Sequence, residues 1–230
     1  MKINHAIILA AGRGTRMLPF SKKTPKAMIK IDGKSLIERG IKEIKKKIEN
    51  IYITVGHHSS LLSAHVISKG VNLIINTEGR GNSWWLYNSL VSKIDQPVLV
   101  LTCDNLIKLN YDFILKQYKK NKKPDCLMFP VTPVQGCEGD YIFAKKNKVL
   151  RLSRNKKTSF YASGMQIINP KKINDKTKPV QNFSNVWKQL IDNNRLYVSD
   201  IYPGKWFAID NPRNLNFFKK DKILKKYFFK

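Results

Sequence analysis

The sequence predicts an α/β fold built on a doubly wound, mostly parallel sheet with a small antiparallel insertion. Short apolar runs alternate with amphipathic helical patterns through the first half of the chain, which is typical of βαβ units. The run at 97–102 is almost wholly apolar, as expected for a parallel strand buried on both faces. In the second half, two short strand patterns at 141–144 and 148–153 flank a Lys-Lys-Asn turn and predict an antiparallel pair.

The first half predicts alternating strands and helices in a regular order. The segment 36–48 carries apolar residues at the spacing of one helix face, and Asn82 or Ser83 can cap a helix that follows. The expected strands are 5–11, 51–55, 71–76, 97–102 and 125–131, and the expected helices are 36–48, 59–68, 83–94 and 111–120.

The second half is more mixed. After the antiparallel pair we expect a strand at 159–168, a helix at 182–193, short strands at 197–202 and 206–210, and a basic terminal helix at 214–230. The sequence contains no Pro/Gly/Ser-rich linker and no internal repeat, so residues 1–230 are expected to form a single domain.

The formal net charge of +27 raises the alternative of a protein that binds nucleic acid or a membrane surface. The lysines are spread along the whole chain, and no nucleic-acid-binding motif accompanies them. The terminal segment 217–229 is basic and aromatic, so it could lie on an anionic membrane or dock on the domain. We favour docking.

No apolar run reaches the about 18 residues of a transmembrane helix, and the first strand begins directly after the first few residues. These observations predict a cytoplasmic protein. The three cysteines, Cys103, Cys126 and Cys137, lack metal-ligand spacing and are expected to be free thiols.

A glycine-rich turn after the first strand points to the chemistry. Gly12 and Gly14 allow the backbone to approach an anion with its N–H groups turned inward, while Arg13, Arg16 and Lys26 add positive charge. No Gly-Lys-Ser/Thr string closes a P-loop. The third glycine of a dinucleotide fingerprint is also missing. The glycines and basic residues of this turn are therefore suited to a triphosphate, although they match neither of these two motifs.

The segments Leu9–Pro19, Thr24–Lys26 and Lys34–Ile37 closely resemble the LAAGxGTRxxPxTxxxPKxxxxxxxxPLI signature of nucleotidyltransferases that activate sugar 1-phosphates and phosphocholine. Ser35 stands where that family usually has proline. The resemblance implies a Rossmann-like nucleotide-diphospho-sugar transferase fold, an NTP and a small phosphorylated acceptor as substrates, and Mg²⁺ as cofactor.

The resemblance also implies roles for individual residues. Asp104, directly after a buried strand, and Asp210 match the family's two metal-binding aspartates. Arg16 would stabilise charge on the transferred phosphate and pyrophosphate, and Lys26 would contact the α-phosphate or the acceptor phosphate. The expected nucleotide-binding residues are Leu9, Ala10, Ala11, Gly12, Arg13, Gly14, Thr15, Gly81 and Asn82.

Two acceptors remain open. The second half resembles uridylyltransferases for N-acetylmuramate 1-phosphate and related sugars. The loop at 79–85, here called the middle loop, resembles phosphocholine and phosphonate cytidylyltransferases. We favour UTP with a sugar 1-phosphate, and CTP with a phosphocholine-like acceptor is the alternative. The expected substrate-binding residues are Trp84, Trp85, Asn105, Asp140 and Gly164.

Overall fold

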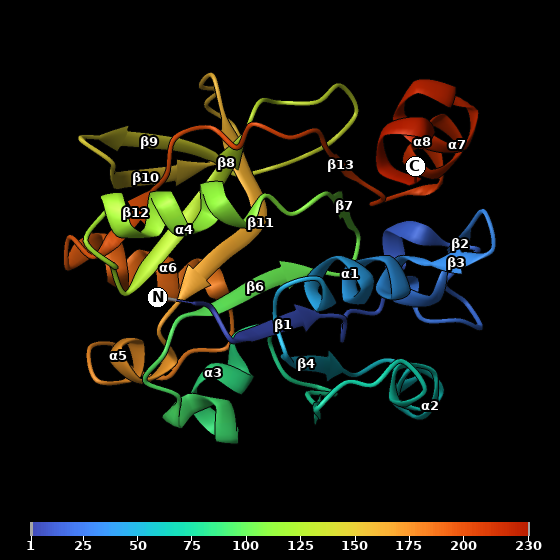
Figure 1. Ribbon diagram of the computed structural model, residues 1–230, viewed down its shortest axis with the longest axis horizontal. Helices are drawn as coiled ribbons and strands as arrows, with labels where there is room; N and C mark the ends of the chain where they lie inside the picture. Colours follow the sequence, from blue (N-terminus) through green and yellow to red (C-terminus); the bar gives the residue numbers. More distant parts are fainter. Residues whose placement is uncertain (1, 230) are drawn as a thin grey trace.

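A nine-stranded mixed sheet forms the centre of the computed structural model, which describes residues 2–229 (Figure 1). The strands lie in the order β5 (Leu73–Asn76), β4 (Asn50–Val55), β1 (His5–Leu9), β6 (Val98–Thr102), β11 (Tyr161–Ile168), β8 (Cys126–Val131), β12 (Leu196–Val198), β10 (Lys148–Ser153) and β9 (Tyr141–Lys145). The prediction of an α/β fold with a doubly wound sheet is confirmed.

The first four strands in this order are parallel to one another, and β8 is parallel to β12. Antiparallel pairing enters at β11, which joins the two parallel groups, and at the edge hairpin of β9 and β10. The expected antiparallel pair is therefore present. The pairing of β11 with β8 is irregular between Ala162 and Gln166, and Gly164 there has a left-handed φ of 80°.

Helices cover both faces of the sheet because successive strand side chains point to opposite faces. In β1, Ala6 and Ile8 belong to one core cluster, while Ile7 belongs to the other. The first cluster is completed by α1 (Leu36–Lys45), α2 (Ser59–Ile67) and α4 (Tyr111–Lys120), and the second by α3 (Trp84–Asn88), α5 (Pro170–Asn174) and α6 (Phe183–Asp192).

Helix α1 begins at a capping box. The Ser35 side chain accepts a hydrogen bond from the Glu38 backbone, and the Glu38 carboxylate accepts one from the Ser35 N–H. This reciprocal cap satisfies two backbone donors that a helix start would leave unpaired. The serine at the position usually occupied by proline in the family signature therefore has a structural role.

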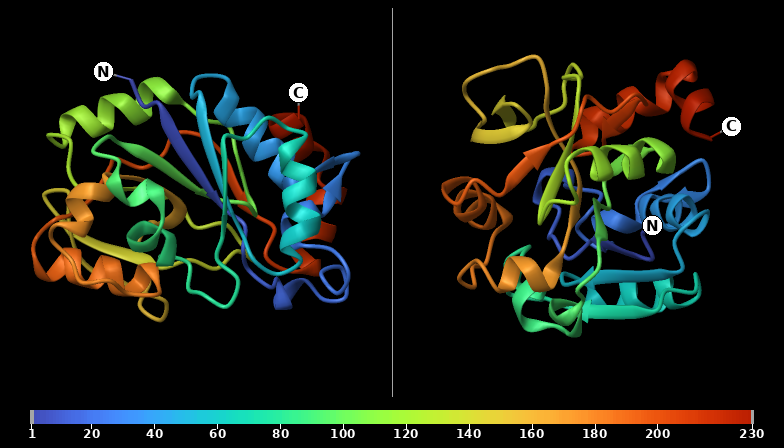
Figure 2. Two further views of the ribbon diagram at one scale, coloured as in Figure 1. Left: turned by 90° about the horizontal axis from the view of Figure 1, so that it is seen from below. Right: turned by 60° about the vertical axis from the view of Figure 1, so that its left-hand side comes forward.

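A third apolar cluster lies at one end of the molecule, where the terminal helices meet two short ribbons (Figures 1 and 2). One ribbon pairs β2 (Lys30–Ile31) with β3 (Lys34–Ser35), and the other pairs β7 (Asn105–Ile107) with β13 (Trp206–Ala208). Helices α7 (Pro212–Lys220) and α8 (Lys222–Phe229) pack against this cluster through Phe218, Leu224, Phe228 and Phe229.

Two expected helices are broken in the structure. The helix expected at 83–94 ends at Asn88, because Ser89 is extended and its hydroxyl caps a separate 3₁₀ turn at Leu90–Lys93. The helix expected at 214–230 begins at Pro212 and divides at Asp221, whose carboxylate caps α8 by accepting bonds from Ile223 and Leu224. In both places a polar side chain competes for the backbone donors.

The strands expected at 5–11, 197–202 and 206–210 are shorter than predicted, and α5, β7 and the β2–β3 ribbon were not predicted. Within residues 2–229, no helix has both the length and the apolar character needed to cross a bilayer.

Candidate active site

The candidate site lies beyond the carboxyl ends of β1 and β6, which are neighbours in the sheet. Leu9 is in register with Thr102, and the Cys103 N–H donates to the Leu9 carbonyl at 3.1 Å. The chain that leaves β1 is the glycine loop, and the chain that leaves β6 carries Asp104. Pairing of the two strands therefore brings together segments separated by more than ninety residues in sequence, at the edge where open α/β sheets bind ligands.

The glycine loop is held in place from both sides. The Ala10 N–H donates to the Thr54 hydroxyl at 3.0 Å, and the Ser21 hydroxyl donates to the Gly14 carbonyl at 2.6 Å. Gly14 adopts a left-handed φ of 63° directly before the 3₁₀ turn Thr15–Met17. This conformation is readily available to glycine and unfavourable for residues with a Cβ atom.

Lys26 bridges the two aspartates expected to bind metal. Its Nζ atom lies 2.5 Å from Oδ2 of Asp104 and 2.9 Å from Oδ1 of Asp210. All three side chains are largely buried, with 11%, 20% and 13% of the Lys26, Asp104 and Asp210 side chains exposed. The structure thus brings one cation and two anions from three distant segments to one point.

Asp210 reaches this point through the β7–β13 ribbon. Asn105, next to Asp104, is in register with Ala208, and the Ile209 N–H donates to the Asp104 carbonyl at 2.9 Å. The ribbon fixes the backbone of both aspartates, so their separation depends on the pairing of β7 with β13.

Burial and ion pairing oppose each other in setting the pKa values of this cluster. Burial alone would raise the pKa of Asp104, but the charge of Lys26 and its hydrogen bond outweigh burial and lower it. Burial alone would lower the pKa of Lys26, but Asp104 and Asp210 outweigh it and raise the pKa. The pair is therefore charged at neutral pH. Burial raises the pKa of Cys103 to about 12, so its thiol stays protonated.

Arg16 lies at the open side of the cluster. Its guanidinium contacts Oδ1 of Asp210 at 3.3 Å and the Glu138 carboxylate at 3.4 Å, and 59% of its side chain is exposed. Both contacts are long, and the Arg16 and Glu138 side chains are exposed, so the contacts hold Arg16 weakly. The guanidinium is free to turn toward an anionic ligand.

The donor set at this point suits Mg²⁺. Magnesium is commonly held by one or two carboxylates together with water and substrate phosphates, and Asp104 and Asp210 supply two carboxylates that face a common cation. Among residues 2–229, no group of three or more His, Cys, Asp or Glu side chains is arranged to hold a metal ion by itself. A metal ion here would therefore depend on phosphate and water oxygens for its remaining ligands.

A cleft of about 540 Å³ contains these groups. Of the predicted site residues, the cleft is lined by Leu9, Ala11, Gly12, Gly14, Thr15, Arg16, Lys26, Gly81, Asn82, Asp104 and Asp210. A neighbouring hollow of about 670 Å³ shares Ala11, Gly12 and Thr15 with the cleft and adds Arg13. Ala10 is buried under the loop.

The middle loop packs against the start of α6. A Cβ atom at Gly81 would lie 1.9 Å from the Gln181 carbonyl oxygen, so glycine is required there by the protein itself. Asn82 accepts a hydrogen bond from the Phe183 N–H at 2.9 Å through its side-chain oxygen. This leaves the Asn82 amide nitrogen as the group available to a ligand.

The two tryptophans lie outside the lining of the cleft. Trp85 is completely buried and donates from Nε1 to the Asn82 carbonyl at 3.0 Å. Trp84 is partly buried, and the Arg80 guanidinium lies 5.7 Å above its ring. The structure therefore places Trp85 in the core and pairs Trp84 with a cation from the protein.

The other three residues expected to bind substrate also lie outside the cleft lining. The Asn105 side chain donates to the Ser163 carbonyl. A Cβ atom at Gly164 would lie 2.6 Å from the Asn105 amide, so these two residues pack on each other. Asp140 pairs with Arg154 at 3.1 Å.

Sequence reasoning missed several residues that line the cleft, among them Thr102, Arg80 and Asn182. Thr102 precedes Asp104 at the end of an apolar run, and that position could have indicated it. Asn182 precedes α6 without capping it through its side chain. Its place in the cleft lining depends on the packing of residues 81–82 against 181–183, which no local pattern reveals.

Three comparisons with known proteins bear on the site. A protein-family model described as nucleotidyl transferase matches residues 5–141. The choline-phosphate cytidylyltransferase of Streptococcus pneumoniae is 35% identical over 127 residues, which are 53% of this chain and 55% of that protein. The bifunctional protein GlmU of Methanococcus aeolicus is 40% identical over 60 residues, which are 26% of this chain and 15% of that protein.

Among solved structures, the inositol-1-phosphate CTP transferase from T. maritima superposes with a TM-score of 0.82. It is 16% identical, and the match covers 99% of this chain and 96% of that chain. The likeness therefore extends over the whole fold, while the similarity in sequence to the curated relatives spans about half of their length or less.

Proposed function

Because the chain belongs to the nucleotidyl transferase family, we propose that it transfers a nucleotidyl group from an NTP to a sugar 1-phosphate and releases pyrophosphate. UTP is the donor that we favour. The observation that carries this proposal is the position of Lys26 between Asp104 and Asp210, in a cleft that the glycine loop also lines.

In the proposed reaction, an oxygen of the acceptor phosphate attacks the α-phosphorus of the NTP, and the bond from that phosphorus to the bridging oxygen breaks. The backbone N–H groups at Gly12 and Gly14 hold the phosphates, and Arg16 turns from its exposed ion pairs toward the pyrophosphate that leaves. Lys26 neutralises the oxygens of the reacting phosphates. The acceptor phosphate is already ionised, so the step needs no general base.

Asp104 and Asp210 would hold the Mg²⁺ ion. When bound, the metal would neutralise charge on the phosphates and orient them for displacement. The carboxylates would also hold Lys26 near the reacting phosphorus, since its ammonium group contacts both of them.

The polar lining of the cleft supports a sugar as the acceptor. Among the described residues, those that line the cleft include hydroxyl and amide side chains at Thr102, Asn82 and Asn182, and no aromatic ring. Hydroxyl and amide groups suit the hydroxyls of a sugar, whereas a quaternary ammonium is typically recognised over an aromatic face. We propose Asn182 as a partner of the sugar and the Asn82 amide as a partner of the nucleotide.

CTP with phosphocholine or a phosphonate is the second candidate. It is supported by the 127-residue stretch shared with a choline-phosphate cytidylyltransferase and by the likeness in fold to an inositol-1-phosphate CTP transferase. This candidate places CTP at the same loop and differs in the acceptor.

The terminal segment gives less support to a membrane-surface protein. Phe228 and Phe229 pack on the apolar cluster of the ribbons, and the Tyr227 hydroxyl accepts from the Lys205 N–H at 3.2 Å. The aromatic residues are thus largely engaged with the protein itself.

A pyrophosphate-release assay with Mg²⁺ tests the proposal. The four common NTPs and dTTP would be crossed with hexose, hexosamine and muramate 1-phosphates, polyol phosphates, phosphocholine and phosphonates. Release with UTP and one sugar 1-phosphate is the expected result. Release only with CTP and phosphocholine or a phosphonate would select the second candidate. No release with any pair, from folded protein, would reject the transferase proposal.

A further inference from the structure

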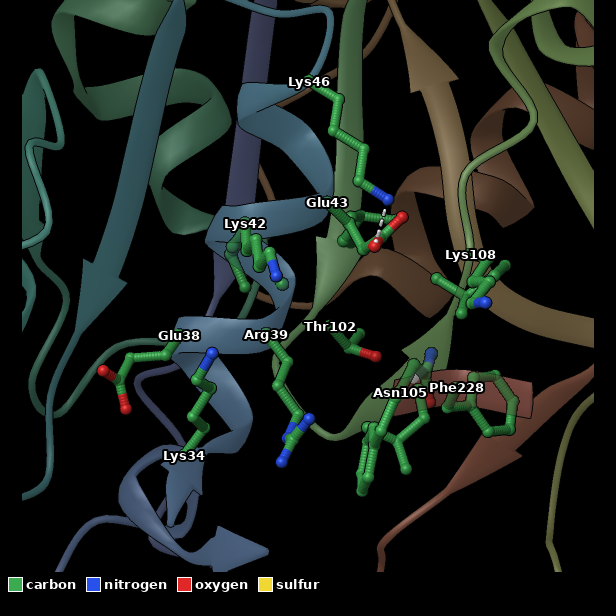
Figure 3. Close-up of a pocket in the computed structure, with 16 residues that line it drawn as sticks. Lys34, Glu38, Arg39, Lys42, Glu43, Lys46, Thr102, Asn105, Lys108 and Phe228 are labelled. Carbon is green, nitrogen blue, oxygen red and sulfur yellow. Dashed lines mark hydrogen bonds and ion pairs between the residues drawn. The ribbon is translucent and has the colours of Figure 1, made fainter. Parts of the chain in front are cut away.

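A second cavity of about 200 Å³ lies between α1, β7 and α8. It is separate from the cleft, although Thr102 lines both. Figure 3 shows Lys34, Arg39 and Lys42 on the α1 side, opposite Lys108 and Phe228. Cationic side chains from distant segments therefore surround one small hollow.

Arg39 is the partly buried cation of this cavity. Its Nε atom is inaccessible to solvent and, within the described chain, has no hydrogen-bond partner. One terminal nitrogen donates to the Ile31 carbonyl, and the guanidinium carbon lies 3.4 Å from the centre of the Phe229 ring. Arg39 also lines the cavity, so an anion there would pair with the charge of its guanidinium group.

The surrounding lysines leave the cavity with excess positive charge. Lys46 pairs with Glu43 at 2.6 Å, and Glu38 is occupied by Lys69 at 2.8 Å and by the capping box. For Lys34, Lys42 and Lys108, no ion pair with a carboxylate is present among residues 2–229. The Lys108 ammonium lies 5.2 Å from the centre of the Tyr227 ring. Ammonium groups without a carboxylate partner beside the partly buried Arg39 guanidinium favour a ligand that concentrates several negative charges in a small volume.

We propose that this cavity is a second binding site for a polyphosphate group, distinct from the catalytic cleft. The volume is below the about 300–1,000 Å³ of typical ligand sites, so the cavity admits phosphate groups rather than a whole nucleotide. The group can come from free pyrophosphate or from the phosphate end of a nucleotide. Both sources present the same chemistry to Arg39 and the lysines.

The cavity is coupled through β7 to the candidate metal site. Thr102 and Asn105, which flank Cys103 and Asp104, line its wall together with Leu106 and Ile107. The same strand pairs with β13, which leads to Asp210. A ligand pressing on β7 would shift the backbone of both aspartates, so occupation of the cavity regulates the reaction. This regulatory part rests on the proposed function.

Calorimetric titration with inorganic pyrophosphate tests the second site without any need for turnover. The variant R16A/K26A removes cations of the cleft, and we expect it to retain one pyrophosphate site. Adding Lys42→Gln and Lys108→Gln should weaken that remaining site at least tenfold. Adding Lys45→Gln instead should not weaken it, because Lys45 is an exposed lysine of α1 outside the cavity.

The proposal is overturned if R16A/K26A binds no pyrophosphate, or if the Lys42 and Lys108 substitutions act no differently from Lys45→Gln. Because Arg39 is partly buried, R39Q is tested second, with its folding checked by circular dichroism. Titration with UTP and CTP separates the sources: tighter binding of a nucleotide than of pyrophosphate at the remaining site identifies a nucleotide end, and equal or weaker binding identifies free pyrophosphate.

Hydrogen exchange in R16A/K26A measures the coupling between the cavity and β7. Saturating pyrophosphate should slow amide exchange in segment 105–107, and the Lys42 and Lys108 substitutions should abolish this change. Binding without any change in this segment would refute regulation through β7, and it would leave the proposed transferase activity untouched.

Discussion

Gly14 and Lys26 lie so close together that a Cβ atom at Gly14 would be 2.9 Å from the Cβ of Lys26. The glycine loop therefore forms the surface on which the Lys26 side chain rests before it reaches Asp104 and Asp210. One backbone position thus controls both the shape of the anion loop and the place of its principal buried cation.

Gly14→Ala is expected to lower both stability and turnover. The left-handed conformation at this position costs a residue with a Cβ atom about 1–2 kcal/mol, and the new methyl group would displace Lys26. Gly12→Ala is the matched control, because nothing lies within 4 Å of a Cβ atom there. Urea unfolding should show a loss of stability for Gly14→Ala and little change for Gly12→Ala. Equal stability of the two variants would contradict the argument.

Asp104→Asn and Asp210→Asn should each remove most Mg²⁺-dependent turnover while the protein stays folded. Each substitution replaces a carboxylate by an amide, which is a weaker ligand for a hard cation. Steady-state rates over a range of Mg²⁺ concentrations measure the effect. Asp192→Asn, at an exposed carboxylate that pairs with Lys188 outside the cleft lining, serves as control and should retain wild-type rates. Wild-type rates in both cleft variants would reject the metal assignment.

Arg16→Ala should cost about 3 kcal/mol of transition-state stabilisation, the scale of removing one preorganised charge donor. Its contacts with Glu138 and Asp210 are long, at 3.4 and 3.3 Å, and its own side chain is 59% exposed, so stability should change little. Comparison of kcat/KM with that of Arg154→Ala, an exposed arginine paired with Asp140, separates the role from a general loss of positive charge. An unchanged kcat in Arg16→Ala would exclude a role of Arg16 in stabilising the transition state.

The capping box of α1 predicts a pH dependence of stability. Hydrogen bonds from Lys69 and from the Ser35 backbone lower the pKa of Glu38 from 4.5 to about 2. Because the folded-state pKa is depressed, the stabilisation is fully present above about pH 4.5 and is lost as the pH falls toward 2. Urea unfolding from pH 6 to 2 should show a steeper loss for the wild type than for Glu38→Gln. Parallel curves would contradict the prediction.

Much of the fold could be predicted because it rests on local patterns. The apolar spacing of Leu36, Ile37, Ile41 and Ile44 indicated α1, and all four side chains are buried. The breaks at Ser89 and Asp221 escaped prediction, since a single side-chain cap decides them. Likewise, the sequence does not distinguish the neighbouring Trp84 and Trp85, and only the packing of the fold buries Trp85 completely.

The sequence by itself determined the α/β class and the glycine loop with its nearby basic residues, which indicates phosphate chemistry, because short-range spacing encodes strands, turns and motifs. Only the tertiary structure decided that Lys26 bridges Asp104 and Asp210, that Asn182 lines the same cleft as the glycine loop, and that Arg39 lines a second cationic cavity. These contacts join segments from tens to nearly two hundred residues apart, and strand order and helix packing set their distances rather than any local pattern.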